Sequence, residues 1–319
     1  MLHLKKNTLV EIVEVNNQLG HIQDLDIVLD TILTEARLLS KATAGTIYLI
    51  NNNQLEFSYV QNEKFNILDN KQIYLGKNLP IDNYSIAGYC AKHSEFIMID
   101  DVYKLDQNVP YSFNKQFDKE NSFQTKSILA CPIFDIKDQV IGVIQLINKK
   151  DSEKKYFLNT DKEIVESLCS IASMHIQRSI ITRDMIVRMI NMAALRDPRE
   201  TANHVNRVGA MSAELYNYWA HKNGISSTKQ KQKKGLIRLA AMLHDVGKIG
   251  VPDKILKKKG PLNKKEFKIM SNHTLYGATL FTNKQSELDE MSHEIALYHH
   301  ESWDGSGYPH GKKFDEIPI

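Results

Sequence analysis

Residues 236–256 read LIRLAAMLHDVGKIGVPDKIL, and the apolar run at the start of this stretch closes on the charged pair His244-Asp245. The run predicts a helix buried in a core, with the charged pair at its buried end. Burying a carboxylate is costly unless it is paired or bound to a metal ion. We therefore expect a functional site where this helix ends.

The rest of the chain after Pro198 also lacks strand signals of weight. Asn263, followed three residues later by Glu266, is typical of a helix start with a reciprocal cap. Helices are expected near residues 200–222, 230–247, 263–275 and 285–300. The rear part of the chain is therefore expected to be all-α, and it contains eight of the twelve histidines.

The front part of the chain has a different pattern, in which short apolar runs alternate with polar turns. An amphipathic helix is expected over residues 22–40 and a short helix over 85–95. Strands are expected at residues 45–50, 55–60, 96–100, 127–135 and 140–149, with a long loop at 102–124. Strands with helices at both ends predict an α+β domain of the size of a sensor.

The segment from Asp161 to about Leu195 is helical in pattern, with no glycine or proline before Pro198. Its apolar positions recur at spacings of four and three, namely Ile164, Leu168, Ile171, Met185, Met189 and Met192. One interpretation is a long connecting helix that packs on its twin in a homodimer. The other is a pair of ordinary amphipathic helices, each packed on its own domain.

Composition and charge limit the number of domains and the classes of function that the chain can have. A chain of 319 residues is expected to hold about two domains, and its 42% hydrophobic content suits globular cores. No apolar stretch is long enough for a membrane span, and the N-terminus does not resemble a secretory signal. Three widely spaced cysteines, Cys90, Cys131 and Cys169, are typical of reduced thiols, so we expect a cytoplasmic protein.

The net charge of +3 is unevenly divided. Residues 181–319 hold 22 basic and 15 acidic residues, a balance of +7, which leaves −4 for the remainder. A basic rear half suits an anionic substrate such as a phosphodiester. The lysine runs at 229–234 and 257–259 lack interleaved aromatic residues, so we interpret them as solvated and expect no nucleic-acid partner.

Seven histidine and carboxylate residues of the rear part form the candidate metal-ligand set. They are Glu200, His204, His244, Asp245, His273, His299 and His300. A mixed nitrogen and oxygen set suits iron, manganese or zinc more than calcium. The set exceeds the needs of one ion, so two or three adjacent ions with Asp245 as a bridge are expected. Any single histidine is more often structural, and His221, His293 and His310 are assigned that role.

These stretches resemble the HD-GYP phosphodiesterases, a branch of the HD superfamily of metal-dependent phosphohydrolases. The order RDPRETANHVNRV, HDVGKIGVPD, NHTLYGATL and HHESWDGSGYP follows the motif order of that family. The resemblance implies hydrolysis of cyclic di-GMP to linear pGpG or GMP at two or three divalent ions, most often iron or manganese. It implies that the seven residues bind metal and that Asp245 and Lys248 are catalytic. Lys248 would contact the phosphate, and Gly305, Tyr308 and Pro309 would bind substrate in a loop shaped by Asp304.

Two departures from the family pattern matter. Ala202 stands where the family usually has glycine. The family also continues beyond the position of Ile319 into helices with another metal-binding aspartate, so we expect the HD-GYP domain, residues 182–319, to be incomplete here. Two alternatives therefore stay open: a catalytically incomplete signalling module that binds metal or a partner, and a hydrolase of another cyclic dinucleotide.

Residues 22–181 resemble a GAF domain, a small-molecule sensor fold with a central antiparallel sheet. The resemblance rests on SIAGYCAKHSEFIMIDD, SILACPIFD and VIGVIQLINKKD. Asn148, Lys149, Phe157 and Asp161 also match a motif of cyclic-nucleotide-binding GAF domains, with Lys162 in place of glutamate. The motif implies a structural contact between Lys149 and Asp161. A small-molecule ligand and a ligand-free dimerisation module both remain open, and Cys90 and Cys131 have no partner pattern for haem or redox chemistry.

Overall fold

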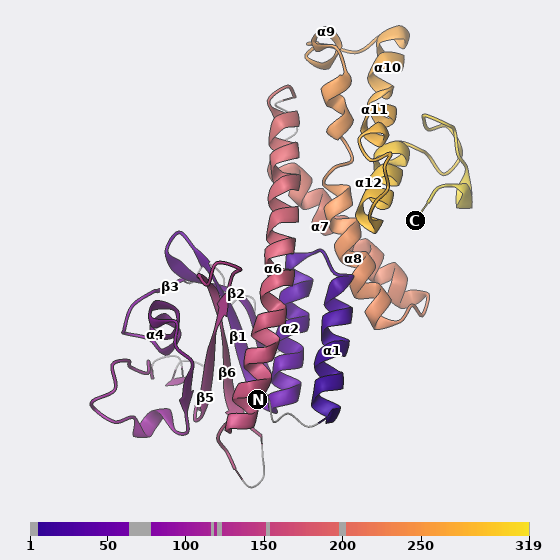
Figure 1. Ribbon diagram of the computed structural model, residues 1–319. Coiled ribbons are helices and arrows are strands. Elements are labelled where there is room, and N and C mark those ends of the chain that lie inside the picture. The colour runs from indigo at the N-terminus through magenta and orange to yellow at the C-terminus, as the bar shows by residue number, and fades with distance from the viewer. Residues whose placement is uncertain are drawn as a thin grey trace. The chain divides into compact units, whose positions relative to one another are not determined.

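The computed structural model describes residues 6–63, 78–115, 118–119, 123–150, 154–197 and 202–318. The chain divides into two compact units, Met1–Ser179 and Ile180–Ile319 (Figure 1). Helix α6 (Asn159–Ala194) begins in the first unit and ends in the second. The segment after Asp161 is therefore one continuous helix, and the interpretation as two separate helices is wrong.

The first unit is built on a six-stranded antiparallel sheet with the order β3-β2-β1-β6-β5-β4. Its strands are β1 (Ala42–Asn51), β2 (Gln54–Asn62), β3 (Asn78–Pro80), β4 (Ile97–Ile99), β5 (Ile128–Phe134) and β6 (Val140–Lys149). The five predicted strands are confirmed. The short edge strand β3 was not predicted, because three residues carry no periodic signal.

Both faces of this sheet are covered, because alternate residues of each strand point to opposite sides. Ile47 and Ile144 are paired across β1 and β6 and are fully buried on the face that contacts α2 (Leu25–Ser40). On the other face, Tyr48 and Val143 pack in a core with α4 (Ile86–His93). Figure 1 shows α2, with α1 (Lys6–Gly20) beyond it, and α4 on opposite sides of the sheet. The expected α+β domain is confirmed.

A buried ion pair joins the end of β6 to the start of α6. Lys149 donates to Asp161, and each side chain is only 6% exposed. Asp161 also accepts a hydrogen bond from the Leu158 amide at 2.7 Å. The predicted structural contact between Lys149 and Asp161 is therefore confirmed, and it fixes the first turn of α6 on the sheet.

The second unit contains no strand among its described residues, which confirms the all-α prediction. Its elements are α7 (Ala202–Lys222), α8 (Ser227–Ala241), η2 (Val246–Gly250), α9 (Asp253–Leu256), α10 (Lys264–Ser271), α11 (His273–Thr279), α12 (Glu287–Tyr298) and η3 (Phe314–Glu316). The reciprocal cap between Asn263 and Glu266 at the start of α10 is present as predicted. No helix of the described chain is long and apolar enough to cross a bilayer.

Three helix boundaries differ from the predictions, and all three carry residues of the candidate site. Helix α8 ends at Ala241, so His244 and Asp245 lie in a turn that leads into η2. Helix α12 ends at Tyr298, so the His299-His300 pair also follows a helix. The segment 263–275 is two helices that meet at Asn272. After α8 the apolar pattern continues because Met242 and Leu243 remain buried although the helix has ended, which is why the sequence overestimated this helix.

The core of the second unit is formed by α6, α7, α8 and α12. Ile186 and Ile190 of α6 pack there with Val205 and Leu239. The buried face of α6 was expected to include Met185, Met189 and Met192. Met185 and Met192 are instead 58% and 60% exposed, so the buried face is displaced by one position, to Ile186 and Ile190. Helices α7 and α8 pack closely at Gly209, where a side chain would meet the Arg238 carbonyl. This core supports the turn that carries His244 and Asp245.

Candidate metal centre

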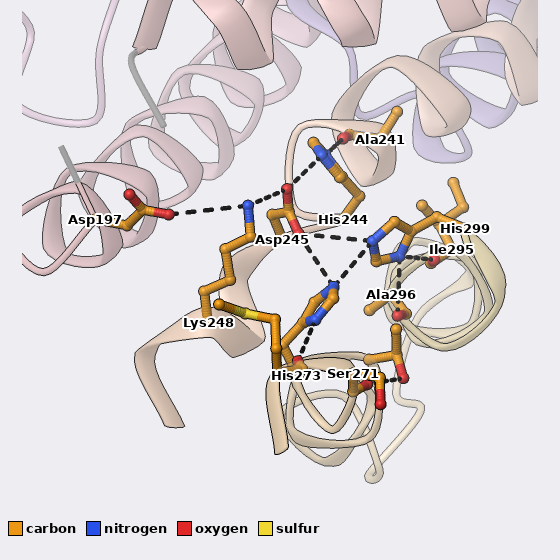
Figure 2. A network of polar contacts seen from close by, with 12 residues as sticks. Asp197, Ala241, His244, Asp245, Lys248, Ser271, His273, Ile295, Ala296 and His299 are labelled. Atoms are coloured by element: carbon orange, nitrogen blue, oxygen red, sulfur yellow. Dashed lines mark hydrogen bonds and ion pairs between the residues drawn. The ribbon is translucent and has the colours of Figure 1, made fainter. Parts of the chain in front are cut away.

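Asp245 stands at the centre of a polar network, with a side chain that is 12% exposed (Figure 2). Its Oδ2 lies 2.9 Å from His244 Nε2 and 2.8 Å from Lys248 Nζ. Its Oδ1 lies 3.2 Å from His273 Nε2 and 3.6 Å from His299 Nε2. One carboxylate therefore faces imidazoles from three separate segments of the chain.

The other ring nitrogen of each of these imidazoles faces a backbone carbonyl. His244 Nδ1 lies 2.8 Å from the carbonyl oxygen of Ala241, and His273 Nδ1 lies 2.7 Å from that of Met270. His299 Nδ1 lies 3.1 Å from the carbonyl oxygens of Ile295 and Ala296. A carbonyl oxygen can only accept, so each Nδ1 carries the proton. In the neutral ring each Nε2 then presents a lone pair, which is the form that binds metal.

These lone pairs converge on acceptor atoms. His273 Nε2 and His299 Nε2 are 3.2 Å apart, and both face Asp245 Oδ1. That oxygen is buried and has no hydrogen-bond partner within the described part of the chain. Opposed lone pairs in a buried place repel one another unless a proton or a cation lies between them. The donor set therefore fits a divalent metal ion.

The protonation states of Asp245 and His300 also suit the binding of a metal ion. Burial alone would raise the pKa of Asp245, but the close contacts with His244, His273 and His299 outweigh burial and hold that pKa below its ordinary value. Desolvation, together with the neighbouring His299 and His273, lowers the pKa of His300 to about 4. At neutral pH the group thus presents a carboxylate and a neutral imidazole, both of which are metal ligands.

The structure brings four of the seven candidate ligands into one group. Asp245, His273, His299 and His300 each offer one ligand atom, and these atoms lie within 4.8 Å of one another. His244 contacts the other oxygen of Asp245. His204, on α7, is half-buried, with its ring centroid 6.3 Å from that of His244. Glu200 lies outside the described residues, so its place in the set stays a prediction.

The loop after α12 folds back on the histidine pair. The Tyr308 ring stacks on His300 with centroids 4.6 Å apart, and the Tyr308 amide donates to the His300 carbonyl at 3.1 Å. Gly305 has a φ of +80°, which favours glycine. A side chain at Gly307 would meet the Ser302 amide nitrogen and the His300 carbonyl oxygen. Tyr308 is thus held beside the metal-ligand group, and Pro309 next to it is half-buried.

Two carboxylates around the same loop complete its local structure. Asp304 Oδ1 accepts from the Ser306 amide at 2.9 Å and from the Ser306 hydroxyl at 2.6 Å. Glu301 accepts from the His310 amide at 2.8 Å and from the Lys312 amide at 3.0 Å. Asp304 was expected to shape the loop, whereas Glu301 was missed. Its position directly after the histidine pair was the available signal.

A second missed residue lies on the far side of Lys248. Asp197 is buried, and its Oδ2 is 3.9 Å from Lys248 Nζ (Figure 2). It follows α6 and precedes Pro198, so in the sequence it reads as an ordinary acid near a helix end. Its burial was the informative property, and the sequence alone does not reveal it.

Comparison with known proteins follows the same division of the chain. Residues 24–176 match the GAF domain family, and residues 188–319 match the HD domain family. The chain combines a GAF domain with an HD domain. The metal-ligand group described above lies entirely in the HD domain, and the six-stranded sheet belongs to the GAF domain.

Several curated proteins are similar to the HD domain. A cyclic di-GMP phosphodiesterase of Thermotoga maritima is 42% identical over 134 residues, which cover 42% of this chain and 34% of that protein. A 3'3'-cGAMP-specific phosphodiesterase 2 of Vibrio cholerae is 38% identical over 138 residues, covering 43% of this chain and 25% of that protein. The matched segment thus spans about a third or less of these relatives.

Proposed function

We propose that the HD domain is a metal-dependent phosphodiesterase that hydrolyses cyclic di-GMP to linear pGpG or GMP. The observation that carries the proposal is the convergence of the His273 and His299 lone pairs on the unpartnered Oδ1 of Asp245. The names of similar proteins, cyclic di-GMP phosphodiesterases among them, support the same substrate class.

The proposed ligands divide between the two oxygens of Asp245. His273, His299 and His300 would hold one ion with Oδ1, and His244 and His204 would hold a second with Oδ2, with Glu200 as a further ligand. The nitrogen and oxygen donors suit iron or manganese. When bound, such ions polarise a phosphoryl oxygen and lower the pKa of water enough to supply a nucleophile near neutral pH.

The remaining residues bind and orient the substrate. Lys248 carries an ammonium group beside Asp245, where it would hold a phosphodiester oxygen and stabilise the charge that develops on it. Burial, reinforced by Asp245, raises the pKa of Tyr308 to about 12, so its hydroxyl stays protonated and can donate to the substrate. Gly305 and Pro309 would shape the wall next to Tyr308. The reaction adds water across one P–O bond, and the sugar oxygen leaves with a proton.

A second candidate substrate has one specific observation in its favour. One similar protein is named a 3'3'-cGAMP-specific phosphodiesterase, and its identity to this chain is close to that of the cyclic di-GMP enzymes. The metal centre would serve either substrate, because both contain the same phosphodiester group. The choice between them would lie in residues that contact the bases.

The GAF domain is proposed to bind a small molecule. A cavity of about 400 Å³ lies between the sheet and α4, and Tyr48, Phe57 and Phe113 are among its aromatic lining residues. Gln145 and Thr46 supply polar groups in the middle of the sheet face. Aromatic walls with a few polar groups are typical of ligand sites. Ligand binding here would be the input that regulates the HD domain.

Helix α6 is proposed to mediate homodimerisation. Its exposed apolar residues recur with coiled-coil spacing, namely Met174, Ile181, Met185 and Met192. A stripe of this kind is the seam through which a second copy of the same helix packs. The mass of the protein in solution, compared with that of a variant with Ile181 and Met185 both changed to Lys, tests this part of the proposal.

The test of the proposed activity combines metal analysis with an assay of cyclic di-GMP hydrolysis on the full chain. Wild-type protein purified with manganese should retain the metal and convert cyclic di-GMP to a linear product. His244→Ala should lose metal and activity together, with activity reduced at least a hundredfold, because removing one ligand opens the site.

The matched control is His293→Ala. His293 Nδ1 also faces a carbonyl oxygen, that of Ala278 at 2.9 Å, but its ring lies outside the metal-ligand group. This variant should keep both metal and activity. Metal retention without turnover in the wild type would instead identify a non-catalytic signalling module, and faster turnover of 3'3'-cGAMP would assign that substrate.

A further inference from the structure

Lys248 lies between two carboxylates in the HD domain. Its Nζ is 2.8 Å from Asp245 Oδ2 and 3.9 Å from Asp197 Oδ2 (Figure 2). The side chains are poorly exposed, at 19% for Lys248, 12% for Asp245 and 9% for Asp197. Electrostatic interactions are screened little at such positions, so the placement of one ammonium group between the two acids has a large effect on both.

The contact between Lys248 and Asp245 conflicts with the proposed use of Asp245. An ammonium group that donates to Oδ2 occupies the oxygen that a metal ion would need. The ammonium group of Lys248 and a metal ion bound at Asp245 would also repel each other, so the two cations compete for the same carboxylate. A second acid on the other side of Lys248 offers the ammonium group an alternative partner.

We propose that Asp197 is a positioning residue that draws the Lys248 ammonium group off Asp245 and so leaves Asp245 free to bind metal. The inference rests on the proposed metal centre. When metal is present, Lys248 turns toward Asp197 and its ammonium group remains beside the site without occupying a ligand atom. Asp197 itself touches neither metal nor substrate.

The backbone around Lys248 is held from two sides, so the exchange involves its side chain alone. Arg196, next to Asp197, donates to the carbonyl oxygens of Ile249 and Val251 and to Asp253 Oδ1 at 2.6 Å. On the opposite side, Gly247 packs so closely on α11 that a side chain there would meet the His273 carbonyl.

Asp197 is in turn fixed to the end of α6. Its amide donates to the Ala193 carbonyl at 3.1 Å, which extends the last turn of the helix. The distance from Asp197 to Lys248 is therefore set by where α6 ends relative to η2. The backbone therefore determines how closely Lys248 can approach Asp197 and Asp245.

A double-mutant cycle on manganese affinity tests the inference. Mn²⁺ binding to the full chain would be measured by calorimetry for the wild type, Asp197→Asn, Lys248→Met and the double variant. Asp197→Asn should weaken binding about tenfold or more, because the ammonium group then stays on Asp245 in a charge-assisted hydrogen bond. Lys248→Met should bind at least as tightly as the wild type, since the competitor is gone.

The decisive comparison is Asp197→Asn in the Lys248→Met background. There the change should have little effect, because no ammonium group remains to be positioned. If Asp197 acted only as a nearby negative charge, or only in folding, the loss would be equal in both backgrounds, and that result would overturn the inference. Asp315→Asn, an exposed acid of the same domain, controls for net charge and should not change the affinity.

The cycle also separates this inference from the proposed function, because it uses no cyclic dinucleotide. A wild type that binds no Mn²⁺ would refute the metal centre and the inference together. A wild type that binds Mn²⁺ with additive effects of the two changes would refute only the role of Asp197.

Discussion

The two domains each bury a carboxylate, but the two carboxylates differ in whether neighbouring groups neutralise them. In the GAF domain, Asp161 is paired with Lys149 and also accepts the Leu158 amide, so its charge is neutralised where it is buried. In the HD domain, Asp245 has one ammonium partner, but its Oδ1 faces imidazole lone pairs and has no hydrogen-bond partner among the described residues. A buried charge that is balanced by its neighbours is structural, whereas one that is left unbalanced indicates a site for an ion.

The largest expected difference between the two carboxylates is in stability. Asp161→Ala should reduce the free energy of unfolding of the GAF domain by about 3–5 kcal/mol, because it leaves the Lys149 ammonium group buried without a partner. Asp245→Asn, measured in chelator, should reduce the stability of the HD domain by less, because Lys248 keeps Asp197 as a second acid 3.9 Å away. Chemical denaturation followed by circular dichroism and by hydrogen exchange of each domain measures both effects.

A second change sharpens this contrast. In the double variant Asp161→Ala with Lys149→Met, a large part of the lost stability should return, because no charge is left buried. Equal losses in the single and double variants would mean that packing around Phe157, which is buried beside the pair, matters more than charge.

The next largest effect is that of metal on the HD domain. Mn²⁺ at one hundred times its dissociation constant should raise the free energy of unfolding of this domain by about 2.7 kcal/mol. Both tryptophans of the chain, Trp219 and Trp303, belong to the HD domain, so tryptophan fluorescence reports on its unfolding alone. The shift should disappear in His244→Ala. An equal shift in that variant would place the metal elsewhere.

The smallest expected effect concerns a buried imidazole of the GAF domain that has no metal-ligand neighbours. His175 on α6 lies 3.1 Å from Asn16 Oδ1 on α1, and burial, followed by the nearby Arg178, lowers its pKa. The pKa of His175 in the folded protein therefore lies below its ordinary value of about 6.5. As the pH falls through that value, His175 binds more protons in the unfolded chain than in the folded one, so stability decreases toward acid pH. In His175→Gln this part of the decrease should be absent, as measured by hydrogen exchange of α1 between pH 7 and 5. An unchanged pH dependence would assign the decrease to other groups.

Much of the fold could be predicted because each domain repeats one periodic pattern. The short apolar runs at residues 45–50 and 55–60, separated by a polar turn, identified β1 and β2. The pattern after Asp161 identified helix, but it left one helix and two helices as alternatives. The predictions failed where periodicity outlasts the element. The run that ends at Asp245 stays apolar beyond Ala241, although the backbone has already left the helix there.

The candidate site could be predicted in composition but not in geometry. Histidines and acids in four motifs pointed to one cluster, and four of them do meet within it. The sequence could not reveal which ring nitrogen of His273 or His299 faces inward, because that depends on backbone carbonyls three or four residues away. Nor could it distinguish the buried Asp197 from a solvated acid near a helix end.

Gly305 and Gly307, in the loop after His300, would tolerate replacement very differently in a diverging lineage. Gly305 needs a left-handed backbone, which asparagine also adopts without great cost, and the atoms that crowd it belong to the flexible Lys313 side chain. Gly307 is enclosed by backbone atoms of residues 300–302, so no other amino acid fits. Mutational drift should therefore be visible at the first position while the second stays invariant for as long as Tyr308 rests on His300.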